Sequence, residues 1–307
     1  MARRKGTPVH GWLVLDKPQQ ITSTHALNKV KRLFDADKAG HAGTLDPLAT
    51  GVLPIAFGEA TKTIPHVMDS VKGYRFLVRW GIETDTDDAE GEPTRESPER
   101  PTMEAIEALL PQFRGTVMQT PPRYSAIKIA GERAYDLARD GEQFDIAPRP
   151  VEITRLDIVA MPTAETCLFE AECGKGTYVR AIARDIGRLL GCFGHVAELR
   201  RTRVGPLTGE DAISLESLIE LSNSADGRDA LMKVLRPVET ALDGIPALAV
   251  NGADAASLKR GKSIILRGRD APIHNGLIYA TSRGMLVALG EVERGELRPT
   301  RVFNLPL

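Results

Sequence analysis

An aspartate in a segment dense with glycine and proline is the first residue of this sequence that could do chemistry. Residues 39–54 read AGHAGTLDPLATGVLP, in which Asp46 is followed directly by Pro47. Glycines let a backbone approach a ligand closely, and the proline stiffens the turn that presents the carboxylate. Asp46 is therefore a candidate nucleophile or base, although a loop aspartate can also simply hydrogen-bond its own turn. We expect the whole segment 39–58 to be a long, shaped loop.

A second group of candidates consists of arginines that could contact phosphates. Three of them recur every four residues, so they would form a single stripe on a helix, and three more follow shortly after. The candidates are Arg180, Arg184, Arg188, Arg200, Arg201 and Arg203. The alternative is that they are solvated or paired with carboxylates such as Asp185. Lys128 and Arg133 lie in a polar segment and are similar candidates for phosphate contact.

Nucleotide hydrolysis and metal catalysis are not supported by the motifs. Residues 174–177 read GKGT and resemble part of a P-loop, but glycine follows the lysine and no glycine lies five residues before Gly174. The six histidines include no H-E-x-x-H pattern and the three cysteines no C-x-x-C spacing. We expect no cofactor and no metal, and plain thiols suited to a reducing cytoplasm.

Composition is that of an ordinary globular protein. The chain has 307 residues, enough for two domains, and a formal net charge of −1, which by itself argues weakly against a nucleic-acid partner. The charge is segregated, however: residues 83–107 hold ten acidic and two basic side chains, whereas 171–205 hold seven basic and three acidic. A local basic surface is therefore compatible with the neutral total. The sequence contains no stretch of about 20 apolar residues, so no membrane-spanning helix is predicted.

Periodicity predicts strands that alternate irregularly with helices. Residues 74–80 alternate as a half-buried strand does, and the apolar runs at 11–15 and near 167–173 indicate two more strands. Helices are expected from Thr22, from Thr102 and over the apolar spacing that ends at Leu189. These elements have to position the candidate residues, and they indicate a mixed α/β or α+β fold.

Three further segments differ from the rest of the chain in composition or in the spacing of their apolar residues. The acidic, proline-containing residues 83–101 are expected to form an exposed connection, and the polar residues 115–148 a projecting loop and helix. From residue 247 short apolar runs are separated by glycine-rich turns, a spacing that suits a small β-barrel-like module. The expected strands of this module lie at 247–250, 264–266, 277–280 and 285–289.

The segment around Asp46 resembles the catalytic aspartate motif of the bacterial tRNA pseudouridine synthase B (TruB) family. Other motifs of that family follow in its order across most of the chain. They include a Lys-Pro motif, a tyrosine-bearing strand, an Asp-rich loop, an RNA-clasping insertion, a Lys-Gly-Thr-Tyr-x-Arg motif and a His-Val-x-x-Leu-Arg-Arg motif. The matching residues are 11–18, 72–75, 84–91, 121–139, 174–180 and 195–201.

The resemblance implies a role for each candidate residue. Asp46 is implied to attack the target nucleoside, either at the uracil ring or at the ribose, with Arg180 as the cation that keeps it ionised. Tyr74 is implied to lie against the flipped uracil and to be a candidate for proton transfer. Three other residues are implied to contact the substrate: Tyr178 and Leu199 line the uracil pocket, and His41 enters the RNA loop that the base has left.

The family also implies a fold, a substrate and a domain division. We expect a mixed, largely antiparallel sheet in a catalytic domain over 1–244, with 115–148 as the clasping insertion, and a PUA-like RNA-binding domain over 245–307. The implied enzyme is a cytoplasmic monomer that isomerises uridine 55 in the TΨC loop of tRNA without guide RNA or protein partner. Two alternatives remain, a guide-RNA-dependent synthase and an RNA-folding or RNA-binding protein whose catalysis is incidental or lost.

Overall fold

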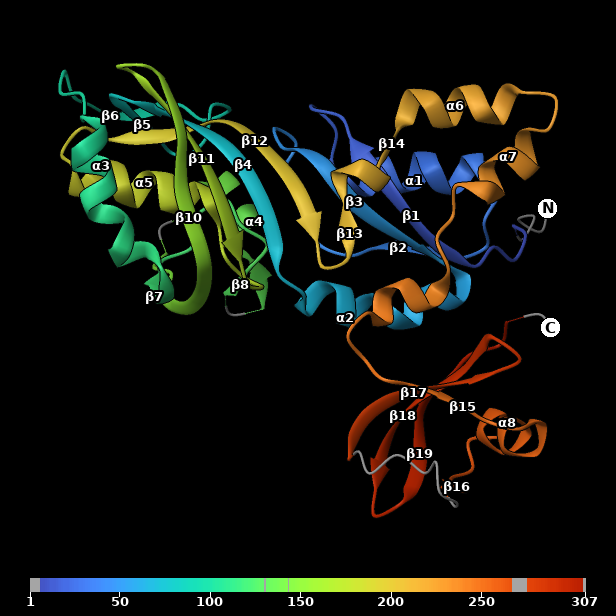
Figure 1. Ribbon diagram of the computed structural model, residues 1–307. Coiled ribbons are helices and arrows are strands. Elements are labelled where there is room, and N and C mark those ends of the chain that lie inside the picture. The colour runs from blue at the N-terminus through green and yellow to red at the C-terminus, as the bar shows by residue number, and fades with distance from the viewer. Residues whose placement is uncertain (1–5, 130, 143, 267–274, 306–307) are drawn as a thin grey trace.

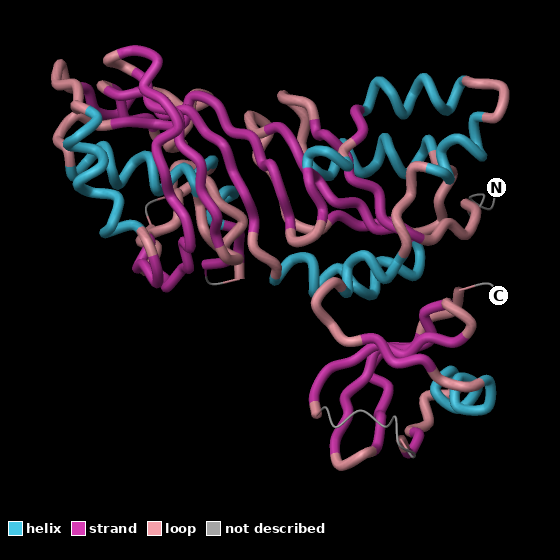
Figure 2. Tube along the Cα trace, viewed as in Figure 1, coloured by secondary structure: helices cyan, strands magenta, loops and turns pink. Residues whose placement is uncertain are grey.

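The computed structural model shows a large sheet-containing unit joined to a smaller β unit (Figure 1). It describes residues 6–129, 131–142, 144–266 and 275–305. Strands run through the middle of the larger unit and helices lie at both its ends, whereas the smaller unit consists mostly of strands (Figure 2). None of the described helices is both long and apolar enough to cross a membrane.

The described residues of the larger unit form a ten-stranded sheet in the order β14-β1-β3-β12-β4-β11-β10-β7, with β13 beside β12 and β2 beside β3. Among its described pairs, β1 with β14 and β12 with β3 are parallel and the others are antiparallel. The predicted mixed, largely antiparallel sheet is thus confirmed. Its strands are β1 (Gly11–Lys17), β2 (Ala39–His41), β3 (Thr50–Phe57), β4 (Lys72–Trp80), β7 (Gly115–Gln119), β10 (Arg149–Thr163), β11 (Thr166–Cys173), β12 (Gly194–Val204), β13 (Leu207–Thr208) and β14 (Ile213–Ser214).

Strand β4 shows why the alternating pattern was informative. Phe76 and Trp80 are buried on one face, where Phe76 stacks on Phe169 of β11 with ring centroids 5.3 Å apart. Arg75 and Arg79 lie on the other face and are exposed. Side chains alternate between the two faces of a strand, so one face joins the core and the other meets water. The predicted strands at 11–15, 74–80 and 167–173 are confirmed.

Helices begin at the hydroxyl caps that the sequence offered. Thr22 accepts a hydrogen bond from the His25 backbone at the start of α1, and Thr102 does the same for Ala105 at α3. The helices and helical turns of this unit are α1 (Ser23–Leu33), η1 (Gly58–Thr63), α2 (Ile64–Asp69), α3 (Met103–Leu109), η2 (Leu110–Phe113), α4 (Ala134–Arg139), α5 (Val179–Leu189), η3 (Gly209–Asp211), α6 (Leu215–Asn223), α7 (Gly227–Lys233) and η4 (Val238–Leu242). Two short hairpins complete it, β5 (Ile82–Thr84) with β6 (Pro93–Glu96) and β8 (Lys128–Ile129) with β9 (Glu132–Arg133).

The expectation that 39–58 is one long loop is wrong at both ends of the segment. Residues 39–41 form β2 and Thr50–Phe57 form β3, which pairs with all seven residues of β1. Strand β3 is buried along nearly its whole length, so it carries a continuous apolar run without the alternation that identifies a half-buried strand. The glycine and proline within the run also argued against a strand, because both residues are typical of turns and loops. The loop proper is confined to 42–49, around Asp46.

The smaller unit confirms the predicted C-terminal β module. Its sheet has the order β15-β17-β18-β19-β16 in the described residues. The elements are β15 (Ala247–Ala249), α8 (Gly252–Lys259), β16 (Ile264–Ile265), β17 (Gly276–Ser282), β18 (Met285–Glu293) and β19 (Glu296–Val302). After β19 the chain returns to the larger unit, where Phe303 is fully buried and Lys62 donates a 2.8 Å hydrogen bond to the Val302 carbonyl. The module is therefore packed against η1.

Replacing Gly51 with alanine should destabilise the fold. Gly51 has φ +97° and lies against β12, where an added Cβ would come within 2.2 Å of the Arg201 carbonyl oxygen. Overpacking against backbone and a left-handed φ together should cost roughly 2–4 kcal/mol in the free energy of unfolding. Urea denaturation would measure it, with Gly209→Ala, where a Cβ meets only ordinary contacts, as the control. Equal midpoints for the two variants would contradict this reading of the β3–β12 contact.

Candidate active site

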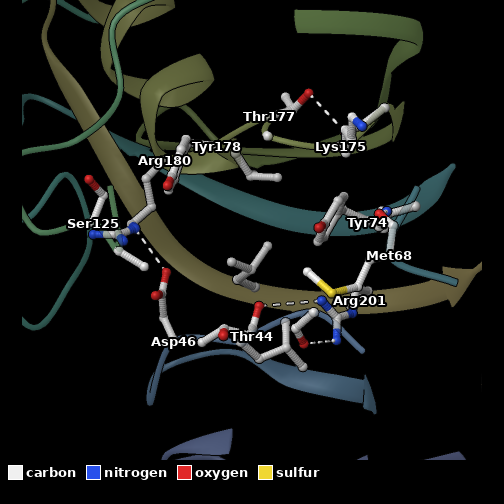
Figure 3. Close-up of a pocket in the computed structure, with 18 of the residues that line it drawn as sticks. Thr44, Asp46, Met68, Tyr74, Ser125, Lys175, Thr177, Tyr178, Arg180 and Arg201 are labelled. Atoms are coloured by element: carbon white, nitrogen blue, oxygen red, sulfur yellow. Dashed lines mark hydrogen bonds and ion pairs between the residues drawn. The ribbon is translucent and has the colours of Figure 1, made fainter. Parts of the chain in front are cut away.

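Five of the six residues implied to act on the substrate line one cavity. Asp46 reaches it from the 42–49 loop, Tyr74 from β4, Tyr178 and Arg180 from the start of α5, and Leu199 from β12. Figure 3 shows Asp46 and Arg180 on one side of this cavity and Tyr74 and Arg201 on the other. Its volume is about 440 Å³, which is the size of a small-molecule site.

Asp46 forms an ion pair with a buried arginine. The Arg180 Nε lies 3.0 Å from Asp46 Oδ2, and Arg180 is 5% exposed whereas the Asp46 side chain is 38% exposed. The other guanidinium nitrogens donate to the carbonyls of Thr86 and Tyr124, at 2.7 and 2.9 Å. Because the arginine is held by these backbone groups, it can orient the carboxylate while the carboxylate stays open to the cavity.

A second carboxylate faces the same guanidinium. Asp88 Oδ2 lies 3.4 Å from Arg180, and burial raises the pKa of Asp88. The Asp88 side chain accepts hydrogen bonds from the Thr86 hydroxyl at 2.6 Å and the Glu90 backbone at 3.1 Å. Asp88 was not among the candidate residues, although it lies in the Asp-rich motif, because no spacing rule connects it to α5.

The loop that carries Asp46 is held from the side of β1. Lys17 is fully buried, and its ammonium donates to the carbonyls of Pro18, Ile21 and Pro47 at 2.9, 2.8 and 3.4 Å. Burial lowers the pKa of Lys17 to about 8. The Ser23 hydroxyl donates to the Leu45 carbonyl and accepts from the Leu45 N–H. Backbone groups on both sides of Asp46 are thus fixed.

Arg201 holds the opposite end of the same loop. It is 2% exposed and donates to the carbonyls of Val52, Gly43 and Thr44 at 2.8, 3.0 and 3.4 Å. The expectation that Arg201 lies on the surface and contacts phosphate is wrong. The side chain is buried, and its guanidinium donates its hydrogen bonds to backbone carbonyls of the protein. It also lies beside Tyr74, whose pKa is raised, chiefly by burial.

The arginine stripe on α5 faces the acidic segment, and two of its three members, Arg180 and Arg184, are buried whereas Arg188 is exposed. Arg184 is buried and lies 2.9 Å from Asp87 Oδ2, while Arg188 makes two hydrogen bonds to Glu83 at 2.7 and 2.9 Å. The expectation that 83–101 is an exposed connection is therefore wrong for its first part, where Glu83 and Asp87 are buried. The expected surface position of Arg184 is wrong for the same reason. Charged groups are buried together because each needs its opposite.

The remaining candidates lie away from the cavity lining. His41 is on β2, its Nδ1 has no hydrogen-bond partner in the described part of the chain, and burial lowers its pKa. Arg200 points to the other side of β12 and pairs with Asp16 at 2.7 Å. Lys128 is exposed on β8, and Arg133 is on β9, its side chain being outside the described structure. Phosphate contact by Arg188, Arg200, Lys128 and Arg133 stays a prediction.

No metal-binding arrangement is found in the described residues: at no point do three or more histidine, cysteine, aspartate or glutamate side chains converge. The cysteines Cys167, Cys173 and Cys192 are free and buried. Burial raises the pKa of the Cys173 thiol to about 12. The groups that line the cavity and could take part in chemistry include the Asp46 carboxylate, tyrosine hydroxyls and the buried guanidinium groups of Arg180 and Arg201.

Comparison with known proteins gives consistent matches. A family model described as "TruB family pseudouridylate synthase (N terminal domain)" matches residues 31–179, and one described as "tRNA pseudouridylate synthase B C-terminal domain" matches residues 180–243. A Rhodopseudomonas palustris protein named "tRNA pseudouridine synthase B" is 62% identical over 304 residues, covering 99% of this chain and 83% of the relative. A protein of the same name from Agrobacterium fabrum is 56% identical over 303 residues, covering 98% and 96%.

Solved structures share the fold. The structure described as "Crystal Structure of a Cbf5-Nop10-Gar1 Complex" superposes with a TM-score of 0.74 at 26% identity, covering 96% of this chain and 84% of the other. A second, "Structure of H/ACA RNP bound to a substrate RNA containing 2'-deoxyuridine", also has a TM-score of 0.74, at 24% identity, covering 96% and 86%. The likeness extends over nearly the whole chain.

The buried Asp87 should make stability depend on pH in an unusual direction. Burial raises the pKa of Asp87 to about 6, even beside Arg184, so the folded protein binds this proton more tightly than the unfolded chain. Raising the pH from about 4 to about 7, through the folded pKa, should therefore lower the stability of the wild type relative to Asp87→Asn, by at most about 3 kcal/mol, with little further change above.

Urea unfolding of both proteins across this range measures the difference. Asp69→Asn serves as the control, because the Lys175 ammonium lowers the pKa of the exposed Asp69 and moves its contribution below about pH 4. A relative stability of the wild type that rises with pH in this window would contradict the assignment.

Proposed function

The chain belongs to the TruB family of pseudouridylate synthases, and from this premise we propose that it isomerises uridine 55 in the TΨC loop of tRNA, with Asp46 as the nucleophile. It is an RNA-modifying isomerase that forms pseudouridine in tRNA. The observation that carries the proposal is the Asp46–Arg180 ion pair at the edge of a cavity of nucleoside size. A carboxylate held by a buried cation and open to a cavity is suited to covalent catalysis.

The reaction rearranges one nucleoside without adding or losing atoms. The bond between uracil N1 and ribose C1′ breaks, the base rotates, and a bond from uracil C5 to C1′ forms, while the C5 proton leaves and N1 gains one. Asp46 assists either by attacking the uracil ring or by attacking C1′, and both routes are open to a carboxylate at this place. Arg180 balances the charge that Asp46 carries before and after the covalent step.

The cavity wall supplies what a base loses when it leaves its stack. Tyr178 offers an aromatic face and Leu199 an apolar contact, which can replace stacking neighbours for a flipped base. Tyr74 lies in the same cavity, and because its pKa is raised by burial it keeps its proton at neutral pH. Its hydroxyl can therefore exchange a proton with the substrate during rearrangement.

His41 acts on the RNA side of the flipped base in this proposal. Burial and the nearby Arg201 lower the pKa of His41, so its imidazole is neutral at physiological pH. A neutral ring can stack in the space that the uridine leaves, which offsets part of the few kcal/mol that unstacking costs.

We also propose that the protein acts on tRNA without a guide RNA or a protein partner, as a cytoplasmic monomer. Residues 1–244 would form the catalytic domain and 245–307 would contact the tRNA as a PUA-like domain. The expectation that all of 115–148 projects from the catalytic domain is wrong for 115–119, which form β7 at the edge of the main sheet, so the RNA clasp would begin after β7. Guide-RNA-dependent action is the rival, because the similar solved structures include an H/ACA particle. The relatives at 56–62% identity that are named as tRNA pseudouridine synthases favour the guide-independent reading. Incubating purified protein with unmodified tRNA transcript and mapping pseudouridine by base separates the two.

Asp46→Asn should abolish turnover while leaving the tRNA dissociation constant within about tenfold, since RNA is held mainly by backbone contacts and loop shape. Tritium release from uridine-labelled tRNA and filter binding measure the two quantities. Asp229→Asn, on the exposed side of α7, is the matched control and should behave as wild type. Activity that survives in Asp46→Asn would remove the nucleophile assignment.

The clasping insertion can be tested through salt dependence. If the exposed Lys128 contacts a phosphate, Lys128→Gln should flatten the plot of log affinity for tRNA against log salt by roughly 0.7–0.9, because one fewer counterion is released. Lys233→Gln removes the same charge from α7, which lies at the other end of the larger unit (Figure 1), and should leave the slope unchanged. Identical slopes for wild type and Lys128→Gln would place the RNA surface elsewhere.

A further inference from the structure

A glutamine outside the cavity holds the backbone of a residue that lines it. Gln119 is the last residue of β7 and is 4% exposed. Its carboxamide oxygen accepts a hydrogen bond from the Tyr178 N–H at 2.8 Å, and its nitrogen donates to the Tyr178 carbonyl at 3.1 Å. Both hydrogen-bonding groups of one peptide residue are thus satisfied by a single side chain that is 59 residues away in the sequence.

Tyr178 occupies a position where the chain offers little local support. It is the N-cap of α5, with extended φ −107° and ψ 113°, and its own side chain makes no capping hydrogen bond. The turn before it contains Gly176 at φ +82°. In a capping box, a glutamate or glutamine three residues into the helix bonds the N–H of the N-cap residue. That place is taken here by Ala181, and Gln119 supplies the missing carboxamide from another strand.

The two hydrogen bonds between Gln119 and Tyr178, here called the clamp, lie next to the contacts that hold Arg180. The carbonyl of Thr120 accepts from Arg184 at 2.7 Å, and that of Tyr124 accepts from Arg180 at 2.9 Å. The segment after Gln119 therefore runs alongside the first two turns of α5 and accepts hydrogen bonds from two of their arginines. A shift of Tyr178 would move both the aromatic wall of the cavity and, two residues on, the guanidinium that orients Asp46.

We propose that Gln119 is a positioning residue for pseudouridine formation, setting the place of Tyr178 and Arg180 relative to the bound nucleoside. The proposal rests on the proposed function of the cavity. Gln119 acts through the backbone of Tyr178 and does not line the cavity itself, so its loss should slow the chemical step and spare tRNA binding. Displacing a catalytic group by about 1 Å can cost on the order of a hundredfold in rate.

Two variants separate the two hydrogen bonds of the clamp. Gln119→Leu removes both at similar size, whereas Gln119→Glu keeps the acceptor but sets a carboxylate against the Tyr178 carbonyl. The single-turnover rate at saturating tRNA should fall about tenfold to a hundredfold in both at pH 7.5, with the tRNA dissociation constant within about threefold of wild type. Gln112→Leu and Gln112→Glu, at an exposed position of η2, are the matched controls and should keep the wild-type rate.

The glutamate variant adds a readout that a purely structural role would not move. A protonated carboxyl both donates and accepts, and burial raises its pKa, so lowering the pH towards 6 should restore part of its rate relative to wild type. Thermal unfolding at each pH shows whether the protein is folded under the assay conditions. If Gln119→Leu does not fold, the pH recovery of Gln119→Glu decides the question.

Three results would overturn the proposal. They are wild-type rates in folded Gln119 variants, a rate loss that merely follows the unfolded fraction, and a rate loss matched by equally weakened tRNA binding. Failure of the proposed function looks different, because then wild type and the Gln112 controls would form no pseudouridine 55, or Asp46→Asn would remain active. An active wild type with unaffected Gln119 variants would overturn this inference alone.

Discussion

The burial of arginine on α5 is the constraint on which the site depends. A guanidinium taken out of water needs partners for its charge and for its five N–H groups. Arg180 and Arg184 find them in segments that are far apart in sequence: the loop of Asp46, the acidic segment at 83–88 and the chain after β7. Satisfying two buried side chains therefore brings three separate segments to one helix end.

Buried pairs of this kind specify arrangement more than they add stability. Removing charges from water costs about as much as their attraction returns, yet deleting one partner leaves an uncompensated charge at a cost of about 3–5 kcal/mol. The raised pKa of Asp87 beside Arg184 shows that desolvation outweighs attraction at that residue. Segments held in this way have few alternative positions, which is what a site for a precise rearrangement needs.

The loop of Asp46 is held by a different device. Lys17 and Arg201 bind its carbonyls from two sides, so both cations are spent on the backbone and neither pairs with the Asp46 carboxylate. Arg180 alone among the described side chains forms an ion pair with that carboxylate. The result is a fixed loop backbone that presents a partly exposed carboxylate. Lys17 and Arg201 affect this carboxylate by holding the backbone in place and not by pairing with it.

The sequence by itself determined the family, the Asp46 motif, the alternating strands and the hydroxyl-capped helices, because motif order, period and capping are local properties of the chain. It failed at β3, whose two buried faces erase the alternation, and at 83–88, whose acids look solvated until their partners are known. The inward turn of Arg184 and Arg201, the pairing of Asp88 with Arg180 and the hold of Gln119 on Tyr178 were decided only by the tertiary structure. Each joins residues tens of positions apart, and a contact of that kind depends on which faces are packed together, which no local pattern records.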